Sequence, residues 1–155
     1  MRVRVIAVGT RMPEWVRTAC GEYLARLKAP PVSLTELEPG ARSAAADPAR
    51  ARAEEGRRLL AALRPGEFVT ALDERGSAPT TRELAAWLQR RLQEGADLAL
   101  LIGGADGLDE EVMARADHRL SLSRLTLPHA LARLLLLEQL YRAHSILANH
   151  PYHRD

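Results

Sequence analysis

The sequence predicts an α/β protein whose strands form a doubly wound, mostly parallel sheet. Short apolar runs of β-type composition alternate with amphipathic helical segments, as in proteins built from repeated strand–helix units. The run 97–102 is apolar almost throughout, so this strand must be covered on both faces, which is typical of a parallel sheet. The chain has 155 residues, enough for one hydrophobic core and too few for two. We therefore expect a single domain over 1–155.

The alternation also predicts the order of the elements. Strands are expected over 2–8, 32–37, 68–72, 97–102 and 119–122. Helices are expected over 13–27, 47–63, 80–93, a short stretch after Asp109, and 128–147. Three of these helices begin with N-cap chemistry: Asp47 before Pro48, Thr80 with Glu83 as a capping box, and Asp109. The small-residue loop 39–46 is the best candidate for disorder.

The first helix should bury one apolar face. That face is predicted to hold Trp15, Val16, Ala19, Cys20, Tyr23, Leu24 and Leu27. Cys20 is the only cysteine, and its place on this face indicates a packed core thiol rather than a nucleophile.

The last helix is the most informative segment of the chain. Pro128 suits its first turn, and the run to Leu147 has no Gly or Pro. Its circumference is mostly Leu, Ala, Ile and Tyr, so the helix should be buried on more than one side, against its own domain and a second copy of the chain. Polar groups inside such a contact are costly unless they are paired or used. At 100° per residue, Arg133 and His144 fall on one side, nearly opposite Glu138 and Arg142.

Composition excludes several classes of protein. The formal net charge is +2, which by itself does not argue for RNA. Acidic residues thin out after Glu111 and all five histidines lie beyond it, so that end is the better anion-facing surface. No stretch approaches the ~20 apolar residues of a membrane span. The N-terminal run is too short and too charged for a signal peptide, and a single cysteine excludes an internal disulfide, so we expect a cytoplasmic protein.

Several strings carry a resemblance to a known family. They are Val-Ile-Ala-Val-Gly-Thr (5–10) with Met12, Pro13 and Trp15, Leu-Leu-Ile-Gly-Gly-x-x-Gly-Leu (100–108), Leu-Thr-Leu-Pro-His (125–129), Arg133, Glu138, Tyr141-Arg142, and Asn-His-Pro-Tyr-His-Arg (149–154). Together and in this order they resemble the RlmH family, and the likeness covers the chain from end to end. That family consists of bacterial SPOUT-class methyltransferases that act on a pseudouridine of large-subunit ribosomal RNA.

The resemblance implies what the pattern alone does not. It implies a C-terminal trefoil knot, a homodimer, S-adenosylmethionine as the methyl donor, and methylation of N3 of pseudouridine 1915 in helix 69 of 23S ribosomal RNA. In the family, the cofactor contacts fall on the positions that match Leu72, Gly103 and the run 122–127, namely Leu122, Ser123, Arg124, Leu125, Thr126 and Leu127. Members are expected to be more basic in the loop 40–47, which here has one basic residue, so RNA contact there should be weaker.

The fold class predicts the same region for a ligand. In open α/β sheets, ligands bind beyond the carboxyl ends of the strands, and three strand ends carry suitable loops, at 72–76, 102–107 and 122–127. Gly103 and Gly104 would let a ligand approach the backbone closely, although a tight turn without a ligand explains them as well. The dinucleotide fingerprint Gly-x-Gly-x-x-Gly is absent after the first strand. A smaller ligand such as S-adenosylmethionine fits better.

Methyl transfer needs in-line approach and a route for the acceptor's proton, but no enzyme nucleophile. A base, or a cation that stabilises the anion of the uracil-type ring, would help. The candidate catalytic residues are His129, Arg133, Glu138, Arg142, Tyr152, His153 and Arg154. Three structural alternatives stay open: a surface ion pair for Glu138–Arg142, a helix-end residue for His129, and a disordered terminus for the tail. A functional tail would stack Tyr152 on a base and pair its cations with phosphate.

Two other functions remain possible on the sequence. One is a SPOUT methyltransferase that acts on tRNA, and the other is a flavodoxin-like binding module without catalysis. His150 and His153 have no well-spaced partner ligand, so no metal is expected.

Overall fold

The computed structural model describes residues 1–43 and 47–154 and contains one five-stranded sheet. Its strands are β1 (Val3–Val8), β2 (Val32–Leu37), β3 (Phe68–Ser77), β4 (Leu98–Ile102) and β5 (His118–Leu120). All four neighbouring pairs are parallel, and the order across the sheet is β2-β1-β4-β3-β5. The predicted parallel α/β architecture is therefore confirmed.

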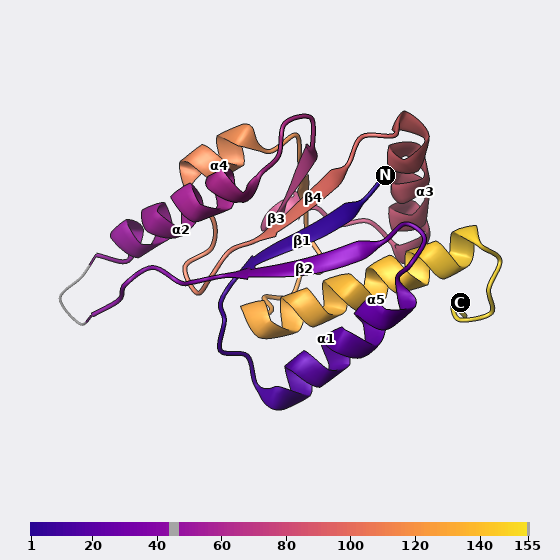
Figure 1. The fold of residues 1–155 in the computed structure, drawn as a ribbon, viewed down its shortest axis with the longest axis horizontal. Helices are drawn as coiled ribbons and strands as arrows, with labels where there is room; N and C mark the ends of the chain where they lie inside the picture. The colour runs from indigo at the N-terminus through magenta and orange to yellow at the C-terminus, as the bar shows by residue number, and fades with distance from the viewer. Residues whose placement is uncertain (44–46, 155) are drawn as a thin grey trace.

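Helices cover both faces of the sheet (Figure 1). One face carries α1 (Glu14–Arg26), α3 (Thr81–Glu94) and α5 (His129–Leu147), and the other carries α2 (Pro48–Ala62) and α4 (Glu110–Arg115). The larger core lies on the α1–α3–α5 side. A smaller one, centred on Ile6, Leu59 and Leu101, lies beneath α2 and α4.

The three predicted N-caps are confirmed. Asp47 accepts a hydrogen bond from the Ala49 amide, Thr80 and Glu83 form the capping box, and Asp109 accepts from the Val112 amide. These starts depend on side chains within three residues of the cap, so the local sequence is enough to predict them.

Four sequence predictions are wrong in detail. β3 continues to Ser77 instead of ending at residue 72, because Ser77 pairs with Leu120 of β5 after a register shift between Leu72 and Ser77. β5 covers 118–120 instead of the predicted 119–122. Pro128 is the N-cap of α5 and lies just outside the helix. Trp15 is 58% exposed rather than on the buried face of α1, which packs through Val16 and Cys20.

The segment predicted as a disorder candidate falls partly outside the described residues, which omit 44–46. Residues 39–43 before the gap lie against α2, held by hydrogen bonds from Arg42 and Arg58. Among the residues that the structure describes, no helix is long and apolar enough to cross a membrane.

Candidate functional site

A cleft of about 950 Å³ opens at the carboxyl edge of the sheet. It lies between the ends of β3, β4 and β5 and the first turn of α5. Its walls include eight of the nine residues predicted to bind the cofactor: Leu72, Gly103, Gly104, Leu122, Ser123, Leu125, Thr126 and Leu127. Arg124 is exposed and is not part of the lining. The size is that of a site for a small organic ligand.

The glycines after β4 form a tight turn at one wall of the cleft. The Gly107 amide donates to the Gly104 carbonyl over 3.1 Å, and Gly107 has φ +77°. A Cβ on Gly103 would lie 2.6 Å from the Gly107 carbonyl, and one on Gly104 would lie 3.1 Å from the Glu55 carboxylate. The packing of the turn therefore excludes a side chain at Gly103 and leaves little room for one at Gly104, whether or not a ligand approaches them.

The segment 121–127 folds along the opposite wall through short local bonds. The Ser121 hydroxyl donates to the Ser123 carbonyl over 2.8 Å, and the Ser123 hydroxyl accepts from the Leu125 amide over 2.9 Å. Thr126 donates to the Glu74 carboxylate over 3.4 Å, which joins this segment to the irregular end of β3. Leu125 is left 75% exposed beside the opening.

Two polar atoms of the cleft lining have no partner within the described part of the chain. They are Oδ2 of Asp73 and Nδ1 of His129, and both atoms are buried. Unsatisfied buried polar atoms are costly, so a ligand that bonds to them would gain affinity. Sequence reasoning named the loop that contains Asp73 but did not single the residue out. Its position directly after a buried strand was the available signal.

The C-terminal tail forms a second polar cluster. Tyr152 donates to Oε1 of Glu138 over 3.2 Å, and its hydroxyl lies 3.1 Å from that of Tyr23. Arg142 makes an ion pair with Glu138 at 2.6 Å, and its guanidinium lies 4.7 Å from the centre of the Tyr152 ring. His153 Nδ1 lies 3.4 Å from the same guanidinium. The structure thus brings four predicted residues together, with Tyr23 as a member that the sequence did not indicate.

Burial and hydrogen bonding fix the charges in this tail cluster. Desolvation, followed by the hydrogen bond with Tyr23 and the charge of Glu138, raises the pKa of Tyr152 above its ordinary value of 10. The hydrogen bond with Glu138 raises the pKa of Arg142. Tyr152 is therefore a neutral phenol and Arg142 a cation at neutral pH, so the pair offers donors rather than a base.

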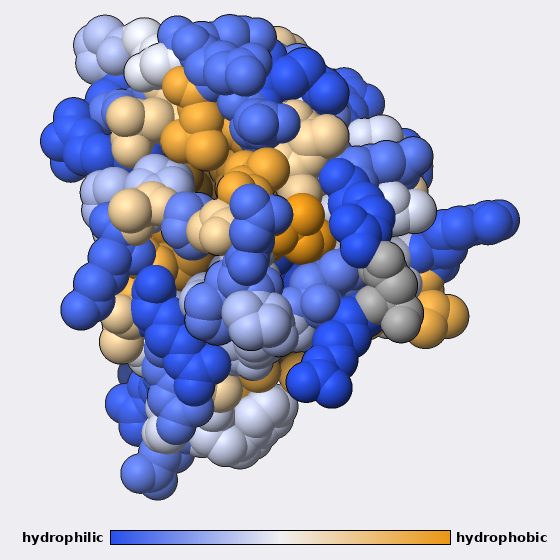
Figure 2. Space-filling view, turned by 90° about the vertical axis from the view of Figure 1, so that its right-hand side faces the viewer, coloured by the Kyte–Doolittle hydropathy of each residue, from blue (hydrophilic) through white to orange (hydrophobic). Residues whose placement is uncertain are grey.

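Within one chain the tail cluster does not reach the cleft. α5 has 19 residues and is about 28 Å long at 1.5 Å per residue. His129 lies at its cleft end, whereas the cluster is built on Glu138 and Arg142, nine and thirteen residues further along the helix, or about 14 and 20 Å. Figure 1 shows the C-terminus at the side of the molecule opposite the carboxyl edge of the sheet. In Figure 2, which faces that side, hydrophilic side chains surround a patch of apolar ones.

Arg133 occupies a different place from the other predicted residues. It is 1% exposed, donates to the carbonyls of Val8 (3.3 Å) and Gly9 (3.1 Å), and forms an ion pair with Glu36 at 2.5 Å. These bonds fasten α5 to the ends of β1 and β2. Arg133 is not among the cleft-lining residues, so its direct contribution is to hold the carboxyl edge of the sheet.

Comparison with known proteins agrees with this architecture. A family model described as "Predicted SPOUT methyltransferase" matches residues 1–153. A relative from Thiobacillus denitrificans named "Ribosomal RNA large subunit methyltransferase H" is 53% identical, with 100% of both chains covered. One of the same name from Alkalilimnicola ehrlichii is 54% identical, with 99% of each covered.

Two solved structures share the fold. A probable methyltransferase from Bordetella pertussis has a TM-score of 0.58 at 21% identity, covering 92% of this chain and 95% of that one. A probable methylase family protein from Haemophilus influenzae has a TM-score of 0.56 at 14% identity, covering 99% and 70%. On the full-length matches to the family model and the sequence relatives, the chain belongs to the SPOUT methyltransferases, in the group named ribosomal RNA large subunit methyltransferase H.

Proposed function

We propose that this protein is one methyltransferase domain that transfers a methyl group from S-adenosylmethionine to N3 of a pseudouridine in large-subunit ribosomal RNA. The observation that carries the proposal is the full-length identity of 53% with a relative named "Ribosomal RNA large subunit methyltransferase H". The nucleotide we propose is pseudouridine 1915 in helix 69. We also propose that the reaction takes place in the cytoplasm, which a ribosomal substrate supports.

The cleft fits the methyl donor. S-adenosylmethionine, when bound, supplies a methyl group on a positively charged sulfur. Leu72, Leu122 and Leu127 offer apolar surface for the adenine, and the buried Asp73 oxygen is an acceptor suited to a hydroxyl of the ribose. The strand-end position is the one that nucleotide-like ligands take in open parallel sheets. The chemistry of these residues needs no metal.

The tail cluster fits the acceptor base. A uracil-type N3 must lose its proton before or during methylation, and the resulting anion gains from nearby donors. Arg142 and the neutral Tyr152 are such donors, while Arg154 is exposed and able to meet a phosphate. The imidazoles of His153 and His129 are the groups we propose as acceptors of that proton.

A complete site then requires two copies of the chain. None of the tail-cluster residues lines the cleft of its own subunit, and a two-fold dimer that packs α5 against its mate would bring the tail of one subunit to the cleft of the other. Leu135, 37% exposed on α5, belongs to the surface left for such a contact. The trefoil knot implied by the resemblance stays a prediction.

Methyl transfer onto defined RNA tests this function. The purified protein would be incubated with labelled S-adenosylmethionine and with ribosomes, 50S subunits or tRNA from a strain that lacks the enzyme. We expect label in 23S RNA alone and, after digestion and mass spectrometry, as 3-methylpseudouridine. Label in tRNA would move the protein to the other methyltransferase class. No label together with no S-adenosylmethionine binding would indicate a non-catalytic module.

A further inference from the structure

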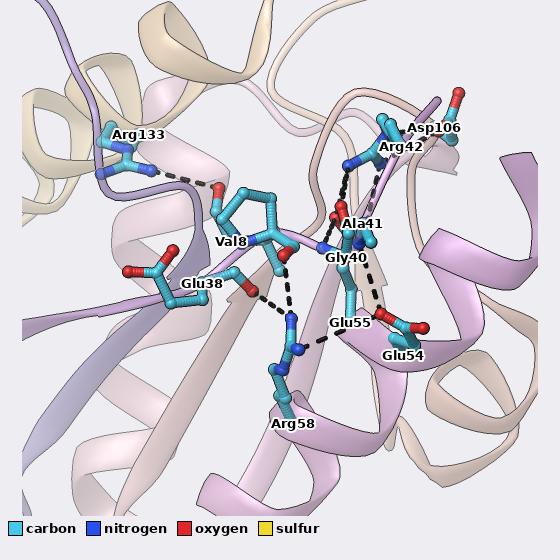
Figure 3. Close-up of polar contacts among 11 residues, drawn as sticks. Val8, Glu38, Gly40, Ala41, Arg42, Glu54, Glu55, Arg58, Asp106 and Arg133 are labelled. Carbon is cyan, nitrogen blue, oxygen red and sulfur yellow. Dashed lines mark hydrogen bonds and ion pairs between the residues drawn. The ribbon is translucent and has the colours of Figure 1, made fainter. Parts of the chain in front are cut away.

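The segment 38–42, between β2 and α2, is held to α2 by hydrogen bonds between its main chain and side chains of the helix (Figure 3). Arg58 donates to the carbonyls of Glu38 and Pro39 over 2.8 and 2.9 Å, and the Gly40 amide donates to Glu55 over 2.9 Å. A Cβ on Gly40 would lie 2.4 Å from the carbonyl oxygen of Ala51. The backbone here therefore lies directly against the helix, and it places Arg42 at a defined position.

Arg42 joins two carboxylates that belong to different parts of the fold. Its terminal nitrogens donate to the two oxygens of Glu55 over 2.9 and 3.1 Å. Its Nε and one terminal nitrogen donate to Oδ2 of Asp106 over 3.1 and 3.0 Å. Glu55 is on α2, whereas Asp106 is in the glycine turn after β4. The planar guanidinium thus connects the helix to the turn in a way that a single ammonium could not reproduce.

The glycine turn after β4 also packs directly against the side chain of Glu55. The Glu55 side chain is 1% exposed. It lies next to Gly104, where an added Cβ would be 3.1 Å from the Glu55 carboxylate. Asp106 is 30% exposed and lines the cleft. The two carboxylates therefore have different consequences: Glu55 is a buried charge that needs a cation for stability, whereas Asp106 serves mainly to fix where the turn lies.

We propose that Arg42 is a positioning residue that holds the Gly103–Gly107 turn in the conformation that binds S-adenosylmethionine. The proposal rests on the function proposed above. It also gives the single basic residue of the loop 40–47 a role other than RNA contact, because the charge of Arg42 is already shared between Glu55 and Asp106. The pKa of Arg42 is raised, first of all by its hydrogen bond to Glu55.

Two variants separate positioning from stability. Asp106→Asn weakens the link to the turn and leaves the buried Arg42–Glu55 pair intact. Arg42→Lys keeps a cation for Glu55 but loses the forked contact to both carboxylates. The control is Arg50→Gln, since Arg50 is also at the start of α2, is 81% exposed and pairs with Glu54 only at 3.9 Å.

Calorimetric titration with S-adenosylmethionine gives the main readout. We call the bridge from Arg42 to Glu55 and Asp106 the Arg42 clamp. We expect both clamp variants, Asp106→Asn and Arg42→Lys, to bind S-adenosylmethionine at least about fivefold more weakly, which is the size of effect that residues acting at a distance have on a binding equilibrium. Their unfolding midpoints should stay near that of the unaltered protein. At saturating S-adenosylmethionine, kcat should return to the unaltered value while KM for the cofactor stays raised. The Arg50→Gln protein should match the unaltered protein in all three.

Hydrogen exchange without the cofactor gives an independent readout. The amides of residues 104–107 should exchange faster in both clamp variants, because the turn opens more often when its contact with Arg42 is weakened. Their exchange rates should be unchanged in the control. Affinity within twofold of the unaltered protein in both clamp variants, or unchanged exchange at these amides, would overturn the proposal. If the unaltered protein bound no S-adenosylmethionine, the proposed function itself would fail, and with it any role of the clamp in cofactor binding.

Discussion

The phenolic oxygen of Tyr152 lies 3.2 Å from Oε1 of Glu138 and donates a hydrogen bond to it. This contact ties the tail to the middle of α5, so the last residues have a fixed place on the helix rather than the freedom of an unused terminus. The ring of Tyr152 also packs edge-on against that of Tyr141, with 4.6 Å between the ring centres. The tail is therefore ordered by a polar and an aromatic contact together.

Replacing Tyr152 by Phe separates these two contacts. The ring packing stays, the donor is lost, and the free energy of unfolding should fall by no more than about 1 kcal/mol. Methyl transfer should fall about 100-fold, as for loss of one preorganised donor, with S-adenosylmethionine affinity unchanged because the cleft is remote. Single-turnover transfer and calorimetry measure both. Tyr141→Phe, in the same aromatic group, is the control, and equal activity of the two variants would show that the Tyr152 hydroxyl does nothing in the reaction.

Gly103→Ala tests the turn beside the cleft. Its Cβ would lie 2.6 Å from the Gly107 carbonyl, too close for the turn to keep its shape. We expect S-adenosylmethionine binding to fall below detection in calorimetry while circular dichroism still shows a folded protein. Gly21→Ala is the control, because nothing lies within 4 Å of that position in α1 and Ala favours a helix by up to about 1 kcal/mol. Full binding by Gly103→Ala would remove this turn from the cofactor site.

His118 gives the protein a pH-dependent stability. Burial, and secondarily the charge of Arg91, lowers its pKa from the ordinary value of 6.5. The unfolded chain then takes up the proton more readily than the folded one, so this contribution is present above pH 6.5 and is lost as the pH falls through the lower folded value. Denaturation by urea at pH 7.5 and pH 5.5 should show the loss.

The matched comparison is between His118→Gln and His150→Gln. The first should show a smaller drop in unfolding free energy between the two pH values than the unaltered protein. The His150→Gln variant should show the same drop as the unaltered protein, since His150 is exposed. His118 also stacks on Trp87 at 5.2 Å, so the pH difference within each variant is the quantity to compare. An equal drop in His118→Gln would assign the effect to other groups.

Local chemistry explains what the sequence could predict of the fold. The three N-caps need only neighbouring residues, and the apolar run of β4 alone implies a strand covered on both faces. The end of β3 is mispredicted because Ser77 pairs with Leu120 of β5, more than 40 residues later. Trp15 is mispredicted because it lies at the edge of the apolar face, about 100° around the helix from Val16, which is 0% exposed.

The sequence predicts which residues belong to the candidate site, but not how they are arranged in space. The cleft gathers the strand-end loops because parallel strands place their carboxyl ends at one edge. The partners of Arg133 on β2 and just after β1 lie 97 and 124 residues away in the chain. The Arg42 clamp joins three separate segments. Neither set of contacts could be predicted from the spacing of residues in the sequence. The distance between cleft and tail follows from how α5 crosses the sheet, which only the fold shows.

A heterodimer made from two inactive chains tests the central claim most directly. One chain would carry Gly103→Val, which disables the cleft, and the other Tyr152→Phe, which disables the tail; co-expression with two different affinity tags allows the mixed dimer to be isolated. If the tail of one subunit serves the cleft of the other, the mixed dimer keeps one complete site and transfers methyl groups at about half the wild-type rate per dimer. A mixed dimer no more active than either parent variant would contradict the account, because cleft and tail would then have to act within the same chain.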